Sequence, residues 1–197
     1  MATRWFTGSV TPDDWSSKPH SACYRGYDAP MDMTFIATGG TIDKIYFDAK
    51  SDYQIGDPQI GEILRAFNVA LSFDLVALMR KDSLELNDAD RQLIVKTVME
   101  HPGDRFVITH GTDTMVQTAR ALAPAAANNT VVLTGALNPA RFIGSDAVFN
   151  IGCAVAACQT LDGGVHLAMN GRIWDPSQVR KNRDANRFEA LQDVRPE

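Results

Sequence analysis

Short apolar runs alternate with segments of helical spacing along most of this chain, and that alternation restricts its possible folds more than any other feature. Apolar runs predict strands, whereas apolar residues three and four apart predict amphipathic helices. A chain that alternates the two buries parallel strands between helices. The sequence therefore predicts an α/β fold with a doubly wound, mostly parallel sheet flanked by helices. Strands are expected at residues 33–37, 73–78, 105–108, 130–134 and 165–169, and helices at 58–67, 88–100, 113–123 and 146–158.

The first thirty residues differ from the rest of the chain. Residues 1–30 combine prolines and aromatic residues without helical or strand periodicity, and they show no basic start followed by an apolar core, as a signal peptide would. We therefore expect an irregular N-terminal extension over 1–30 and a single α/β domain over 31–197. Residues 43–57 are polar and rich in turn formers, so they are expected to form a loop. Asp57 then caps the first helix, with Pro58 at its first position.

Composition excludes several classes of function. The net charge is −5 and no run of Lys and Arg occurs, which argues against a nucleic-acid partner. Three cysteines without metal-ligand spacing argue against a disulfide framework or a metal site and favour the cytoplasm. The longest apolar stretch, residues 147–158, is interrupted by Asn150 and Gly152 and is too short to span a bilayer. The chain is thus expected to act without nucleic acid, membrane or metal.

Three predicted strands end in turns rich in threonine and glycine, at residues 38–41, 109–114 and 134–136. In a parallel sheet all three turns lie at the same edge, where open α/β folds bind their ligands. The glycines allow backbone N–H groups to approach a ligand closely, and a helix start at 112–114 favours an anion. No Gly-x-Gly-x-x-Gly pattern or Walker lysine follows, so nucleotide binding is disfavoured.

Two of these turns carry long, specific motifs. Ala-Thr-Gly-Gly-Thr-Ile at 37–42 and Thr-His-Gly-Thr-Asp-Thr-Met at 109–115 resemble the two signature motifs of the bacterial-type L-asparaginases, the asparaginase/glutaminase family. The resemblance covers residues 33–188. It implies a hydrolase of asparagine catabolism that converts L-asparagine and water to aspartate and ammonia, needs no cofactor, and assembles as a homodimer or homotetramer. Residues 31–197 then form the catalytic domain, and the family's smaller carboxy-terminal domain is expected to be absent.

The resemblance also assigns roles to individual residues. It makes a threonine the nucleophile of a covalent acyl-enzyme, a route that splits one difficult step into two. A second threonine, an aspartate and a lysine position or activate the attacking group, and a tyrosine assists the nucleophile. The predicted catalytic residues are Thr41 (the nucleophile), Tyr53, Thr112, Asp113 and Lys181, and the predicted substrate-binding residues are Gly40, Ser83, Thr112, Asp113 and Ala136.

Each substrate contact has a chemical reason. Ser83 and backbone donors suit the carboxylate of a free amino acid, and Asp113 suits its ammonium group. Leu84 replaces a glutamine found after the serine in many secreted members, so weaker substrate binding is expected. Burial would lower the pKa of Lys181, whereas Asp113 would raise it, and the sequence leaves the balance open. His110 is expected to support the turn by hydrogen bonding.

Alternative functions remain. A glutaminase of mixed specificity is the nearest, because one extra methylene changes discrimination only modestly in a permissive pocket. A non-catalytic amino-acid-binding module belongs to a different class. A component of a tRNA-dependent amidotransferase shares the motifs but usually carries further domains.

Overall fold

The protein, seen here as a computed structural model, is described over residues 32–47 and 52–191. Its main sheet has six strands in the order β4-β1-β5-β6-β7-β8. The first five pair in parallel, and β8 pairs antiparallel with β7. The strands are β1 (Asp32–Gly39), β4 (Ser72–Lys81), β5 (Arg105–Thr109), β6 (Thr130–Thr134), β7 (Gly164–Met169) and β8 (Arg172–Trp174). The predicted mostly parallel sheet is confirmed.

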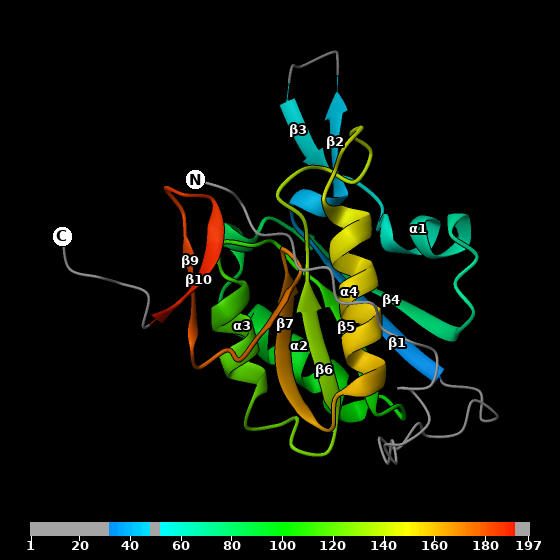
Figure 1. Cartoon of the computed structure of the whole chain (residues 1–197), viewed down its shortest axis with the longest axis vertical. Coiled ribbons are helices and arrows are strands. Elements are labelled where there is room, and N and C mark those ends of the chain that lie inside the picture. The colour runs from blue at the N-terminus through cyan, green and yellow to red at the C-terminus, as the bar shows by residue number, and fades with distance from the viewer. Residues whose placement is uncertain (1–31, 48–51, 192–197) are drawn as a thin grey trace, which may run out of the picture. The chain divides into compact units, whose positions relative to one another are not determined.

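Helices cover both faces of this sheet (Figure 1). They are α1 (Ile60–Ala66), α2 (Asp88–Glu100), α3 (Met115–Leu122) and α4 (Ala147–Thr160). Alternate residues of β1 point to opposite faces, so Phe35 packs with α1 and α4 while Ile36 packs with α2 and α3. The strands are therefore buried on both sides, as the continuous apolar runs in the sequence require. This arrangement confirms the predicted doubly wound architecture.

Two antiparallel hairpins accompany the sheet. One pairs β2 (Lys44–Phe47) with β3 (Asp52–Ile55), and the other pairs β9 (Val179–Asn182) with β10 (Arg187–Ala190). The prediction of a loop over 43–57 was therefore wrong for the described parts of that range. The range contains two strands of only four residues each, which include aromatic and β-branched residues with high strand propensity. The polar turn formers around them obscured this signal in the sequence.

The start of the first helix also differs from the prediction. Helix α1 begins at Ile60, with Gln59 at the N-cap position, so the proposed cap at Asp57 and first position at Pro58 were wrong. The Asp57 carboxylate instead pairs with Arg80 at 2.5 Å. This ion pair connects the segment before α1 to β4.

The starts of the longer helices were predicted more closely. Helix α2 begins at Asp88, as predicted, and Asn87 caps it in a capping box with Asp90. Helix α4 begins at Ala147, one residue after the predicted start, with Asp146 at the N-cap position, and the Ser145 hydroxyl accepts a hydrogen bond from the Ala147 amide at 3.1 Å. None of the helices in the described ranges is long and apolar enough to cross a bilayer. Residues 1–30 lie outside those ranges, so the boundary at residue 31 stays a prediction.

Candidate active site

The three threonine–glycine turns meet at one edge of the sheet, as the sequence predicted. The His110 amide donates to the Thr134 carbonyl at 2.9 Å, which joins the end of β5 to the end of β6. The Thr38 hydroxyl donates to the Thr109 carbonyl at 2.8 Å, which joins β1 to β5. These buried bonds fix the three strand ends relative to one another and make the edge a rigid base for a site.

Glycines bring the turns into direct backbone contact. Gly40 has a φ of 91° and lies so close to Gly111 that a Cβ there would overlap the Gly111 backbone. A Cβ on Gly111 would in turn overlap the Ser83 side chain. The buried Ser83 is held further by the Thr114 hydroxyl, which donates to its carbonyl at 2.7 Å. The structure therefore packs Gly40, Gly111 and Ser83 against one another in series.

Two of the predicted catalytic threonines directly follow the two glycines that are in contact. Thr41 directly follows Gly40 and is half-buried at the first position of the short 3-10 helix η2 (Thr41–Asp43). Thr112 directly follows Gly111 and is buried. Asp113 comes next, two residues before α3 begins, where the partial positive charge of the helix end stabilises a carboxylate.

His110 is a structural residue of this edge. It is fully buried, with Nδ1 2.7 Å from the Gly111 carbonyl and Nε2 2.8 Å from the Thr118 hydroxyl. Because a carbonyl oxygen only accepts, Nδ1 carries the proton and the Thr118 hydroxyl donates to Nε2. Burial lowers the pKa of His110 to about 4, so the ring is neutral at pH 7. The expected support of the turn by hydrogen bonding is confirmed.

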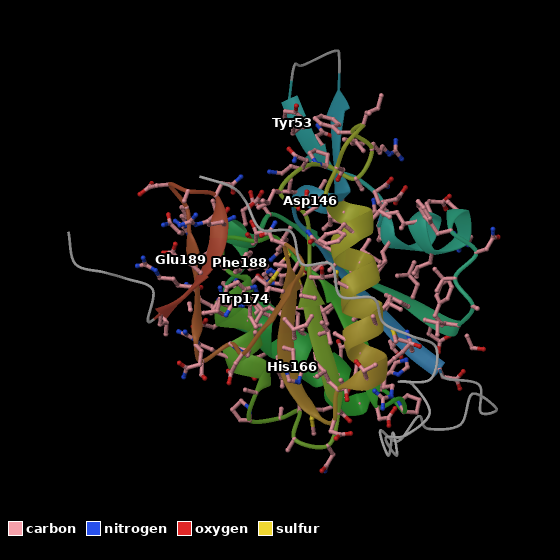
Figure 2. All side chains as sticks on the ribbon, in the orientation of Figure 1. Tyr53, Asp146, His166, Trp174, Phe188 and Glu189 are labelled. Atoms are coloured by element: carbon pink, nitrogen blue, oxygen red, sulfur yellow. The ribbon has the colours of Figure 1, made fainter. Side chains whose placement is uncertain are left out.

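The third turn is held by a partly buried hydrogen-bond network that the sequence analysis missed. Asp146, at the start of α4 (Figure 2), accepts hydrogen bonds from the amides of Leu137 at 3.0 Å and Asn138 at 3.1 Å. Asn150, one helical turn later, donates to the Gly135 carbonyl at 3.0 Å and to Asp146 at 2.8 Å. Ala136 is buried within this turn. The available signal was Asn150 itself, a polar residue inside an apolar helix.

The predicted catalytic lysine lies on the β9–β10 hairpin. Lys181 Nζ donates to Asn186 Oδ1 at 2.8 Å and lies 5.3 Å from the centroid of the Phe188 ring. Burial lowers the pKa of Lys181, against the opposing influence of the negative charges of Asp113 and Asp146. Of the two influences on this pKa that the sequence left open, burial is the larger.

Asp113 has a cationic partner that the sequence analysis missed. Arg183 Nε lies 3.6 Å from Asp113 Oδ1, and Arg183 belongs to the turn of the hairpin that carries Lys181. The signal was available as a second cation two residues after the predicted lysine, but its target depends on how the hairpin lies against α3.

Tyr53 lies on the other hairpin. It is half-exposed on β3, with its ring centroid 6.3 Å from that of Phe142, and Figure 2 shows it beyond Asp146 at the same end of the sheet. Tyr53 and the exposed Leu84 line one open cavity of about 460 Å³. The cavity is also lined by Lys44, Gln54, Ile55, Arg80, Asp82 and Glu85. Tyr53 therefore faces the segment that immediately follows the predicted carboxylate-binding serine.

Comparison with known proteins decides the family. Residues 32–196 match the family model described as asparaginase, N-terminal. The chain belongs to the asparaginase family. It is 31% identical over 159 residues to L-asparaginase 2 of Escherichia coli, covering 76% of this chain and 46% of that protein. It is 30% identical over 185 residues to a glutamyl-tRNA(Gln) amidotransferase component of Archaeoglobus fulgidus, covering 83% of this chain and 42% of that protein.

The solved structures agree with the fold. The thermostable L-asparaginase from Thermococcus kodakarensis superposes with a TM-score of 0.72 at 26% identity, covering 82% of this chain and 51% of that one. The asparaginase-family domain seen here thus spans about half the length of the relatives it matches. Family membership supports an amidohydrolase. The matched relatives are named for different reactions, so membership alone does not identify which amide is hydrolysed.

Proposed function

We propose that this asparaginase-family domain hydrolyses the side-chain amide of L-asparagine to aspartate and ammonia through an acyl-enzyme on Thr41. The observation that carries the proposal is the backbone contact between Gly40 and Gly111. Because of this contact, Thr41 and Thr112, one from each family motif, follow touching turns at the edge of the sheet where open α/β folds commonly bind ligands. A two-step acyl transfer requires a nucleophile with an activating group nearby, and the two turns supply a hydroxyl from each motif.

In the proposed reaction the Thr41 hydroxyl attacks the amide carbon and loses its proton, with Tyr53 assisting. The C–N bond then breaks, the nitrogen leaves as ammonia after taking up a proton, and an ester on Thr41 remains. Water attacks this ester, releases aspartate and restores the hydroxyl. Backbone N–H groups of the two glycine turns stabilise the oxyanion, and a donor of this kind typically contributes about 3–4 kcal/mol.

The second set of residues supports the water step and substrate binding. A lowered pKa raises the fraction of Lys181 that is neutral and able to take a proton, and we propose that Lys181 acts together with Thr112. Ser83 suits the substrate carboxylate, and Asp113 suits its ammonium group. Asp146 and Asn150 hold the turn around Ala136, which we propose as the third turn that lines the site.

Ammonia release from L-asparagine tests the proposal. We expect the wild type to be active and Thr41→Ala, Thr112→Ala and Lys181→Met each to lose at least about 100-fold in kcat, the scale of a missing catalytic group. Thr160→Ala is the matched control, because Thr160 lies at the far end of α4 and bonds only within that helix in the described contacts. Full activity in all three site variants would overturn the assignment. Asparagine binding without turnover in the wild type would favour an amino-acid-binding module.

A glutaminase of mixed specificity is the second candidate. The observation that favours it is the exposed Leu84 beside Ser83. The Leu84 side chain is apolar, so it has no group that could distinguish asparagine from the longer glutamine by a hydrogen bond. Such a surface discriminates one methylene only modestly. Ammonia release from L-glutamine, measured beside L-asparagine in the same preparation, ranks the two. Cytoplasmic localisation and assembly as a homodimer or homotetramer remain predictions.

A further inference from the structure

The carboxylate proposed to receive the substrate ammonium group already has a cation from its own chain. Arg183 Nε lies 3.6 Å from Asp113 Oδ1. The Arg183 side chain is 59% exposed and that of Asp113 is 34% exposed, so both groups remain in contact with solvent. An incoming ammonium group therefore meets a carboxylate that is accessible but partly neutralised.

Hydrogen bonds within the hairpin turn fix the backbone of Arg183. The Arg183 backbone carbonyl accepts the Asn186 amide at 3.1 Å, and the Asn182 side chain accepts the Ala185 amide at 3.0 Å. Asn186 has a φ of 46°, a conformation that asparagine tolerates in a tight turn. The same turn bonds Lys181 through Asn186. The hairpin that carries the proposed catalytic lysine on β9 thus also presents the arginine of its turn to Asp113.

We propose that Arg183 occupies the ammonium subsite at Asp113 in the free protein and so sets how strongly the site prefers amides with an α-ammonium group over amides without one. The inference rests on the proposed function, because Asp113 receives an ammonium group only if the substrate is an amino acid. Arg183 acts here as a specificity residue: it touches the residue that binds substrate and takes no part in the bond changes.

The electrostatics give the two kinds of substrate opposite responses. Asparagine must place its ammonium group beside a guanidinium that already partly neutralises Asp113, so Arg183 weakens the binding of asparagine. Succinamate carries the same amide and carboxylate but no ammonium group. For this substrate, Arg183 offsets the repulsion from Asp113 and strengthens binding. Because the pair is partly exposed, each effect is small, about two- to five-fold.

Steady-state kinetics of Arg183→Gln with both substrates test the proposal. We expect the KM for asparagine to fall about two- to five-fold and the KM for succinamate to rise by a similar factor, each with a smaller change in kcat. Arg187→Gln is the matched control, since Arg187 lies on the same hairpin, carries the same charge and pairs with Glu189 at 3.5 Å. It should change neither KM.

Opposite shifts in Arg183→Gln with none in Arg187→Gln support the proposal. Shifts in one common direction, no shift, or equal shifts in the two variants overturn it, because a general effect of charge or folding does not invert with the substrate. Absence of ammonia release by the wild type would instead refute the proposed function. In that case calorimetric titration with L-aspartate and succinate tests the inference through binding alone. Compared with the wild type, Arg183→Gln must bind aspartate more tightly and succinate more weakly.

Discussion

At the scale of single residues, Asp43 is a buried carboxyl group close to the proposed nucleophile, and its ionisation costs free energy in the folded protein. Its carboxylate is buried two residues after Thr41 and accepts the Gln59 amide at 2.8 Å, which ties η2 to the start of α1. Burial raises the pKa of Asp43 to about 6, although that hydrogen bond and the charge of Arg80 oppose the rise. The ionised carboxylate is therefore held at an energetic disadvantage in the folded protein.

This leads to a prediction about pH. Since the folded state binds the Asp43 proton more tightly than the unfolded chain, its contribution to stability falls as pH rises from about 4 to about 6. Asp43→Asn keeps an acceptor for the Gln59 amide but cannot ionise. We expect the variant to gain on the order of 1–3 kcal/mol over the wild type between these pH values.

Urea unfolding of the two proteins from pH 4 to pH 7 measures this difference. The difference is the useful quantity, because His110 is present in both proteins and contributes the opposite slope: its folded pKa of about 4 makes stability rise with pH. Parallel stability curves for the two proteins would show that Asp43 titrates alike in the folded and unfolded chains.

At the scale of elements, the sequence predicted those with strong local periodicity and missed those defined by pairing. Five main strands and the four helices follow from apolar runs and helical spacing. The four hairpin strands are short, and β9 and β10 pair through cross-strand contacts such as Arg180 with Glu189. Tyr53 and Lys181 lie on these hairpins, so the motifs identified them but could not predict their contacts.

Two glycines of different elements make a contrasting prediction. Gly152 lies inside α4, and a Cβ there would meet nothing within 4 Å. We expect Gly152→Ala to raise the free energy of unfolding by about 0.5–1 kcal/mol, because alanine loses less backbone entropy in a helix. Gly111→Ala must instead push Ser83 aside, and we expect it to lower stability by about 1–3 kcal/mol.

Denaturant unfolding of both variants, with ammonia release measured in parallel, checks this contrast. Gly152→Ala should keep wild-type activity, whereas Gly111→Ala should lose it because the touching turns separate. Equal effects of the two substitutions on stability would mean that close packing does not explain the glycine at position 111.

At the scale of the whole molecule, the sequence predicted where the three turns meet but not how the charges around them are arranged. The rule that ligands bind at the carboxyl edge of a parallel sheet was enough to group the three turns. Arg183 lies 70 positions after Asp113 in the numbering, and Asp146 reaches back to Leu137 across the start of α4. Such contacts depend on how elements pack, which no local pattern contains.

The packed layers also predict which part of the chain folds by itself. Buried apolar residues on the two faces of the sheet extend from Met33 to Phe188, so residues 31–197 contain a core on each face. We expect a chain that starts at Met31 to keep its Tm within about 2–4 °C of the full chain, the shift that roughly 1 kcal/mol produces in a domain of this size. Scanning calorimetry of both chains, with ammonia release as the second readout, measures this. A larger fall in Tm would mean that residues 1–30 stabilise the domain, and a loss of activity at unchanged Tm would mean that they contribute to the site instead.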